Sequence, residues 1–318
     1  MRIPKVSKRI QGAIAATSSI FLLGWLGAYA LPRPNLLPIS ASAEAKRDQL
    51  WSRVERTAYR PGFLPTEGPG ALDLAKLLYT PFLQVTFLHT SDEMPLGRKR
   101  VIHTFGSIAK VRFETLPGVP FTGLFESGGI GLIRLSLAAQ GGTFTPGFGL
   151  KILVSGQPSV NFQAMYSLDG QGEDHNFFAH RFSNIVAPPE SFALKVGAQA
   201  FAAAIHSLPG APENERTLPL EEAAAIRADG ATVAHVIAPY EIEFWPTKAA
   251  ASFTPSQDDL DVRERLAAIP MGTQLYEVTA RDRQGNRSGV GRIVTDSPII
   301  ASQYGDETIF FQHQSRLH

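Results

Sequence analysis

Apolar and polar positions alternate over the middle of the chain in the manner of β-strands. The first stretch, residues 97–113 (GRKRVIHTFGSIAKVRF), places His103 among spaced apolar and aromatic side chains. Further strands are predicted over 131–139, 148–156 and 159–168, with glycine and proline pairs marking the turns between them. Partial alternation is typical of strands covered on both faces. We therefore expect the first strand to carry His103 into the interior of a β-rich domain.

Helical patterns flank this block of strands. An apolar stripe predicts a helix over 43–59, and a second helix over 71–89 is expected to break before Pro81. The remaining predicted elements are helices over 188–210, 218–230 and 257–269, a strand over 234–247 and a hairpin over 274–296. This order favours an α+β fold, an antiparallel β-barrel with flanking helices.

The N-terminus has the pattern of a membrane-targeting segment. The basic residues Arg2, Lys5, Lys8 and Arg9 precede an uncharged stretch over 10–32. About 20 apolar residues can cross a bilayer, and Ala28-Tyr29-Ala30 also suits signal peptidase. The segment is thus either a cleaved signal or a retained anchor, and a buried core helix is the alternative.

We expect three parts along the chain: a signal peptide or membrane anchor over 1–31, a linker and N-terminal arm over 32–70, and a barrel domain over 71–318. The basic flank of the first part directs the domain away from the cytoplasm. The protein is therefore expected to be exported, either periplasmic or anchored in the membrane.

The composition argues against some classes of function. Lys and Arg number 30 against 29 Asp and Glu, and the sequence has no basic stripe interleaved with aromatics, so a nucleic-acid partner is not expected. Cysteine is absent, which excludes disulfides, thiolate ligands and cysteine catalysis.

Three motifs follow one another along the strands: R-V-I-H at 100–103, I-R-L-S at 133–136 and G-F-G-L-K at 147–151. Their order resembles the haem-binding barrel of the catalase superfamily, over 95–180 and more loosely over 235–300. The resemblance implies a catalase-like antiparallel barrel with haem as cofactor.

The resemblance also implies roles for single residues. His103 would pass a proton between the two oxygens of a bound peroxide, which requires a neutral imidazole. Arg100 and Arg134 would contact the haem propionates, since a guanidinium fork matches a carboxylate. Asn176 would assist the histidine, with Asn161 as second choice.

Each of these residues also has a purely structural interpretation. His103 can be a hydrogen-bonded core histidine, and Arg100 can belong to a solvated run of charges. Arg134 interrupts apolar residues, so it either faces solvent or has a buried anionic partner. The two asparagines can be loop or turn amides.

The iron ligand departs from the family pattern. Catalases bind iron through a tyrosine in an R-x-x-x-Y helix, which this sequence lacks. Tyr304 and His313 are the nearby substitutes, because tyrosinate and imidazole can both ligate haem iron. Three hypotheses stay open: an unusual ligand, a haem protein without true catalase turnover, or a barrel that has lost its cofactor.

Another polar group could bind a divalent metal. It consists of Asp169, Glu173, Asp174, His175 and His180. Its spacing matches no metal motif, so a solvated loop is favoured.

The leading hypothesis is a haem-dependent, catalase-like or peroxidase-like oxidoreductase that acts on hydrogen peroxide or an organic hydroperoxide. A location at the membrane would suit a lipid hydroperoxide. The alternative is a non-enzymatic barrel that has lost haem and binds an apolar ligand or a protein partner.

Overall fold

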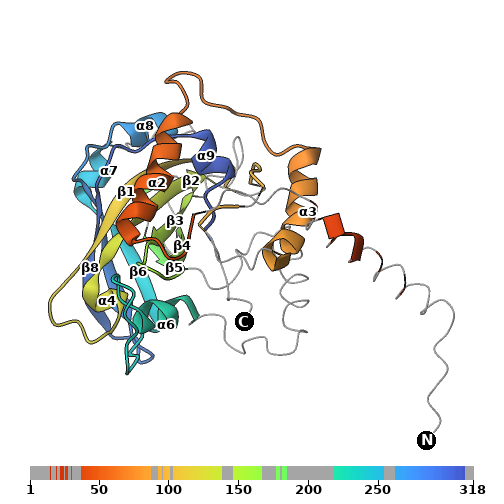
Figure 1. Cartoon of the computed structure of the whole chain (residues 1–318). Coiled ribbons are helices and arrows are strands. Elements are labelled where there is room, and N and C mark those ends of the chain that lie inside the picture. Colours follow the sequence, from red (N-terminus) through yellow and green to blue (C-terminus); the bar gives the residue numbers. More distant parts are fainter. Residues whose placement is uncertain are drawn as a thin grey trace, which may run out of the picture.

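The computed structural model of the chain contains one antiparallel β-barrel with helices on its outside (Figure 1). The structure describes residues 37–86, 92–94, 96–100, 103–137, 146–166, 177–179, 181–184, 218–253 and 262–311, and a few positions between 15 and 30. The predicted helix over 188–210 and almost all of the predicted N-terminal segment lie outside these residues. Within them, no helix is both long and apolar enough to cross a bilayer.

Eight strands of the described chain pair in sequence order, and the last pairs with the first to close the barrel. They are β1 (Phe105–Thr115), β2 (Gly129–Leu137), β3 (Pro146–Ile152), β4 (Val160–Tyr166), β5 (Phe182–Asn184), β6 (Glu241–Pro246), β7 (Gln274–Arg281) and β8 (Arg287–Thr295). The predicted antiparallel barrel with flanking helices is thereby confirmed.

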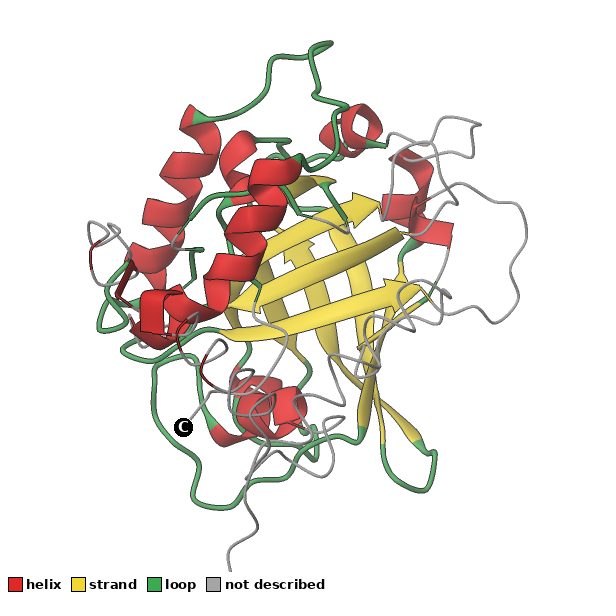
Figure 2. Cartoon of the chain, turned by 90° about the vertical axis from the view of Figure 1, so that its right-hand side faces the viewer, coloured by secondary structure: helices red, strands yellow, loops and turns green. Residues whose placement is uncertain are grey.

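Helices lie on more than one side of the barrel (Figure 2). They are α2 (Ala43–Arg56), α3 (Ala71–Thr86), α4 (Leu124–Ser127), α6 (Leu218–Ala225), α7 (Lys248–Phe253), α8 (Arg263–Ala267) and α9 (Gln303–Glu307), with a short 3-10 turn, η1 (Phe177–Ala179). The predicted break in α3 before Pro81 is wrong, because the helix continues to Thr86. A proline removes one backbone hydrogen bond and can bend a helix without ending it.

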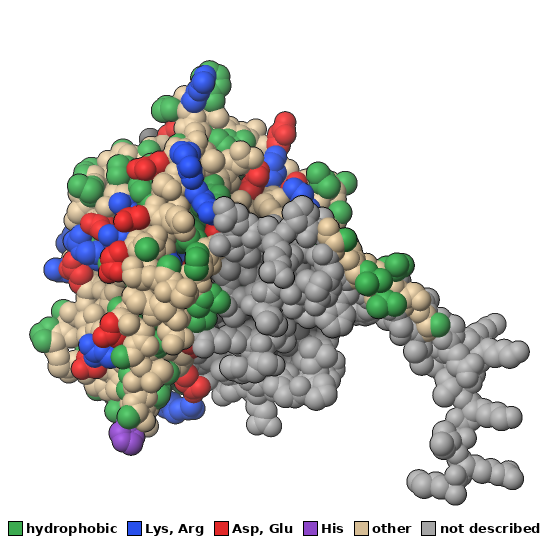
Figure 3. Space-filling view, viewed as in Figure 1, with side chains coloured by type: hydrophobic (Ala, Val, Ile, Leu, Met, Phe, Trp, Pro, Cys, Tyr) green, Lys and Arg blue, Asp and Glu red, His purple; other side chains and the backbone are tan. Residues whose placement is uncertain are grey.

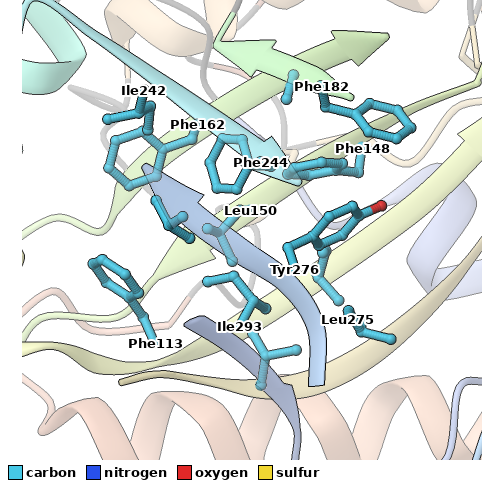
Figure 4. Close-up of a cluster of buried hydrophobic side chains, with 14 of the residues drawn as sticks. Phe113, Phe148, Leu150, Phe162, Phe182, Ile242, Phe244, Leu275, Tyr276 and Ile293 are labelled. Carbon is cyan, nitrogen blue, oxygen red and sulfur yellow. The ribbon is translucent and has the colours of Figure 1, made fainter. Parts of the chain in front are cut away.

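Aromatic side chains fill the inside of the barrel (Figure 4). The Phe148 ring lies 4.9 Å from the ring centroids of both Phe244 and Tyr276. On β2, Ile133 and Leu135 belong to this interior cluster. The interior is a packed core, as in other small barrels.

The outside of β1–β3 carries a second core. The even-numbered Leu132 of β2 packs there with Leu50 and Trp51 of α2, and with Tyr304 of α9. Strand residues alternate between the two faces. Therefore Arg134 and Ser136, in step with Leu132, also face outward under the helices.

The seam between β1 and β8 leaves no room for a side chain at Gly291. A Cβ there would lie 2.3 Å from the Glu114 carbonyl oxygen. We expect Gly291→Ala to destabilise the fold by about 1–3 kcal/mol, as overpacking does, measured by urea unfolding. At the control, Gly289→Ala, the nearest atom is a mobile methyl of Leu116 at 3.1 Å, so a much smaller loss is expected. Equal losses of stability in the two variants would contradict the close packing of β1 against β8 at Gly291.

Candidate functional site

His103 precedes the first strand instead of lying within it. Its backbone is left-handed, with a φ of 55°, and β1 begins only at Phe105. The expectation of a histidine in mid-strand that enters the barrel interior is therefore wrong, because strand backbone cannot take this conformation. A left-handed histidine is uncommon and costs free energy, which makes it a candidate for function.

The His103 ring lies on the outer face of the barrel, against β2 and β3. Its Nδ1 is 3.2 Å from the Ser136 hydroxyl. A Cβ at Gly147 would be 2.8 Å from the ring, so only a glycine leaves the ring in this place. The R-V-I-H, I-R-L-S and G-F-G-L-K motifs thus meet at one point.

The partner of Nδ1 decides what the other ring nitrogen can do. Ser136 can donate its hydroxyl hydrogen to the Gly147 carbonyl, 3.4 Å away. Nδ1–H then donates to Ser136, and Nε2 keeps its lone pair. Among the described residues no hydrogen bond involves Nε2, which is therefore the nitrogen able to take up a proton.

Burial lowers the pKa of His103 to about 4, and the positive charges of Arg134 and Arg100 add to this effect. Desolvation and a nearby like charge both disfavour the imidazolium. The ring is therefore neutral at pH 7, the form that a proton acceptor needs.

Arg134 has a buried anionic partner, one of its two predicted alternatives. Its Nη2 lies 2.5 Å from the Asp306 carboxylate, and the two side chains are only 5% and 6% exposed. The same carboxylate oxygen accepts from the Gly106 amide at 3.0 Å, and Arg134 also donates to the Thr104 carbonyl at 3.2 Å. The Arg134 Nε and the second Asp306 oxygen have no partner among the described residues.

Arg100 is not a solvated residue. Its guanidinium donates to the Gly305 carbonyl at 3.0 Å, and also to the carbonyls of Asp306 and Ile309. Two of these carbonyls lie in the last turn of α9 and the third lies just after it, where backbone carbonyls lack helical partners. Arg100 and Arg134 together fasten α9 across the outer face of the barrel, beside His103.

Tyr304 is occupied by a different set of partners. Its hydroxyl lies 2.5 Å from the Glu93 carboxylate, which also pairs with Arg53. Burial first, and then the charge of Glu93, raise the pKa of Tyr304. The tyrosinate needed for an iron ligand is therefore strongly disfavoured. His313, the other proposed ligand, lies outside the described residues.

The asparagine candidates do not meet His103 in the described structure. Asn161, on β4, accepts from Lys151 at 2.8 Å, and Lys151 also pairs with Asp92 at 2.9 Å. Asn176 lies outside the described residues, as does the Asp169–His180 polar group. Within the described part, no cluster of metal-ligating side chains is present.

Sequence reasoning missed Asp306 and the role of Ser136. The serine could have been found, since it ends the I-R-L-S motif two residues after Arg134. Residues two apart on a strand share a face. Asp306 carries no such signal, because it lies 172 positions from Arg134 along the chain.

Only part of this site has the features that haem chemistry would need. His103 has the charge state and the free nitrogen expected of a proton shuttle. Arg100 and the Nη2 of Arg134 are already bound to α9, however, and the Phe311 ring packs so closely on Gly149 that a Cβ there would lie 2.7 Å from it. To bind haem carboxylates or iron, the arginines and Tyr304 would have to release these partners in the chain.

Protonation of His103 makes the stability of the fold depend on pH. The folded-state pKa of His103, about 4, lies below the ordinary 6.5, so the unfolded chain takes up this proton first as pH falls. Above about pH 6.5 this proton does not affect the free energy of unfolding. Between there and pH 4 the free energy of unfolding decreases by up to about 3 kcal/mol. We expect His103→Asn, which tolerates left-handed backbone, to lose less stability than the wild type between pH 7 and 4.5. The measurement is the free energy of unfolding from urea titrations at each pH. The same decrease in both proteins would contradict the prediction.

Loss of the Asp306 charge should destabilise the fold. Asp306→Asn keeps the shape and leaves the Arg134 charge buried without a counter-ion, so we expect a loss of about 3–5 kcal/mol in the free energy of unfolding. The neighbouring, more exposed Glu307→Gln should change it by less than about 0.5 kcal/mol. Thermal unfolding of both variants tests this, and a similarly small loss in both would contradict it.

Comparison with protein families, curated proteins and solved structures finds no match for this chain. The resemblance to the catalase superfamily therefore rests on the three sequence motifs alone.

Proposed function

We propose that this protein is a haem-dependent, catalase-like or peroxidase-like oxidoreductase, acting on hydrogen peroxide or an organic hydroperoxide. The observation that supports it most is the neutral, left-handed His103, with Nδ1 held by Ser136 and Nε2 without a described partner. A purely structural histidine needs neither the strained backbone nor the closely fitted Gly147.

In this proposal His103 moves a proton. Cleavage of a peroxide requires one oxygen to lose a proton and the other to gain one. Nε2 accepts the first proton and returns it to the second oxygen, while Ser136 keeps the ring oriented through Nδ1. Haem, when bound, would supply the redox chemistry. A lipid hydroperoxide is the substrate that the apolar N-terminal stretch favours.

The second candidate is a barrel without catalysis, which binds an apolar ligand or a protein partner. The Arg134–Asp306 pair and the Tyr304–Glu93 hydrogen bond favour it. These interactions pair Arg134 and Tyr304, the side chains that haem would need, with carboxylates of the chain itself. In this candidate His103 is a half-buried polar side chain that packs against β2 and β3 through Ser136 and Gly147.

One experiment separates the two candidates. The full chain is expressed with a supply of haem, purified, and examined by visible spectroscopy for a Soret band. The proposal expects the band, and expects His103→Gln to keep it while peroxide turnover falls about 10²-fold or more. His235→Gln is the matched control, since His235 is exposed and far from the site in sequence. A colourless protein, or an unchanged rate in His103→Gln, would remove the enzymatic proposal.

A further inference from the structure

His103 is the one described residue other than glycine that has a positive φ, at 55°. An L-residue rarely takes left-handed backbone, because its Cβ then comes too close to the following carbonyl oxygen. Such a conformation persists only where the surrounding structure fixes it. The contacts of the next residue, Thr104, show what fixes it here.

The side chain of Thr104 closes the backbone around the histidine. Its hydroxyl donates to the Arg100 carbonyl at 2.7 Å, so the bond reaches back across His103. Thr104 is only 6% exposed, and a hydrogen bond is stronger where water is excluded. A threonine hydroxyl bound to a nearby carbonyl offers the backbone an alternative to regular structure. Strand β1 accordingly begins only after this turn, at Phe105.

The backbone of Thr104 is held as well. Its carbonyl accepts from Arg134 Nη2 at 3.2 Å. The Arg134 guanidinium is paired with Asp306 and lies against Gly106, where a Cβ would be 2.8 Å from Arg134 Cζ. Thr104 is thus attached to β2 through its carbonyl and to Arg100 through its side chain.

This backbone determines where the His103 ring lies. Nδ1 is 3.2 Å from the Ser136 hydroxyl, and a Cβ on Gly147 would lie 2.8 Å from the ring atom Cε1. On the face shown in Figure 3, no histidine side chain of the described residues is visible around α9. If His103 relaxed to a negative φ, its Cβ would point in another direction and the ring would leave Ser136.

We propose that Thr104 is a positioning residue: its hydroxyl keeps His103 in left-handed backbone, and thereby keeps Nδ1 on Ser136 and Nε2 accessible to a substrate. The effect on turnover rests on the proposed function, whereas the effect on the ring does not. The alternative is a threonine that only stabilises the turn, whose loss would lower stability and leave the ring in place.

Variants of the full chain test the role of this hydroxyl. Thr104→Val removes it and keeps the shape of the side chain, Thr104→Ser keeps it, and Thr115→Val is the matched control. Thr115 lies at the other end of β1, and its hydroxyl also donates to a backbone carbonyl, that of Glu126, at 2.8 Å. Urea unfolding shows whether each variant folds, and Thr104→Ala takes the place of the valine variant if that chain does not.

The position of the ring is measured by NMR of protein with isotope-labelled histidine, and the His103 signals are assigned by their loss in His103→Gln. The wild type, Thr104→Ser and Thr115→Val should show a single neutral tautomer with the proton on Nδ1. Thr104→Val should show a mixture of tautomers, because a ring released from Ser136 can carry the proton on either nitrogen. Unchanged signals in Thr104→Val, or an equal change in Thr104→Ser or Thr115→Val, would overturn the proposal.

Peroxide turnover of the haem-loaded chain separates this inference from the proposed function. Displacement of a catalytic group by about 1 Å can cost a factor of about 10², so kcat should fall at least about 10-fold in Thr104→Val. KM should stay nearly the same, since binding is not changed. A wild type without turnover, whose His103 signals still change in Thr104→Val, would contradict the proposed function and support the positioning role. Full turnover in Thr104→Val would overturn that role.

Discussion

The ion pair between Arg134 and Asp306 is the interaction on which the rest of the site depends. Both side chains are almost fully buried, at 5% and 6% exposure. Removing two charges from water is costly, and their attraction repays the cost only when further hydrogen bonds complete the geometry. The Gly106 amide and the Thr104 carbonyl supply two of these bonds. Through this pair α9 is held on the barrel, beside the segment that carries His103.

The arginine of this pair also affects the chemistry of the histidine. Burial is the main factor that lowers the pKa of His103, and the nearby charge of Arg134 acts in the same direction, so the imidazole stays neutral well below pH 7. Asp306 offsets only part of the positive charge, since Arg100 lies there too and, among the described residues, donates to backbone carbonyls. Burial also raises the pKa of Asp306 itself, against the pull of Arg134. A carboxylate from a ligand would have to compete with this internal one.

A second buried network holds the N-terminal arm in place. Lys46 of α2 donates to the carbonyls of Val154 and Gln157 at 2.8 and 2.6 Å, and Lys151 of β3 pairs with Asp92. The outside of β1–β3 thus combines an apolar layer with charged contacts, whereas the barrel interior is aromatic. Charges in such a layer favour one position of α2 and α9, because any other would leave them buried without partners.

The sequence by itself determined the antiparallel barrel class, most of the strands along the chain and the three motifs that meet at His103, whereas β5 was not predicted. These depend on local alternation, turn residues and short spacings, which are written in neighbouring positions. Only the tertiary structure decided that the histidine lies outside the barrel in left-handed backbone, and that Asp306 and Tyr304 are tied to partners 172 and 211 positions away. The partner of a buried charge is decided by which distant segments pack together in the folded chain. No local sequence pattern indicates which carboxylate will lie beside a given arginine.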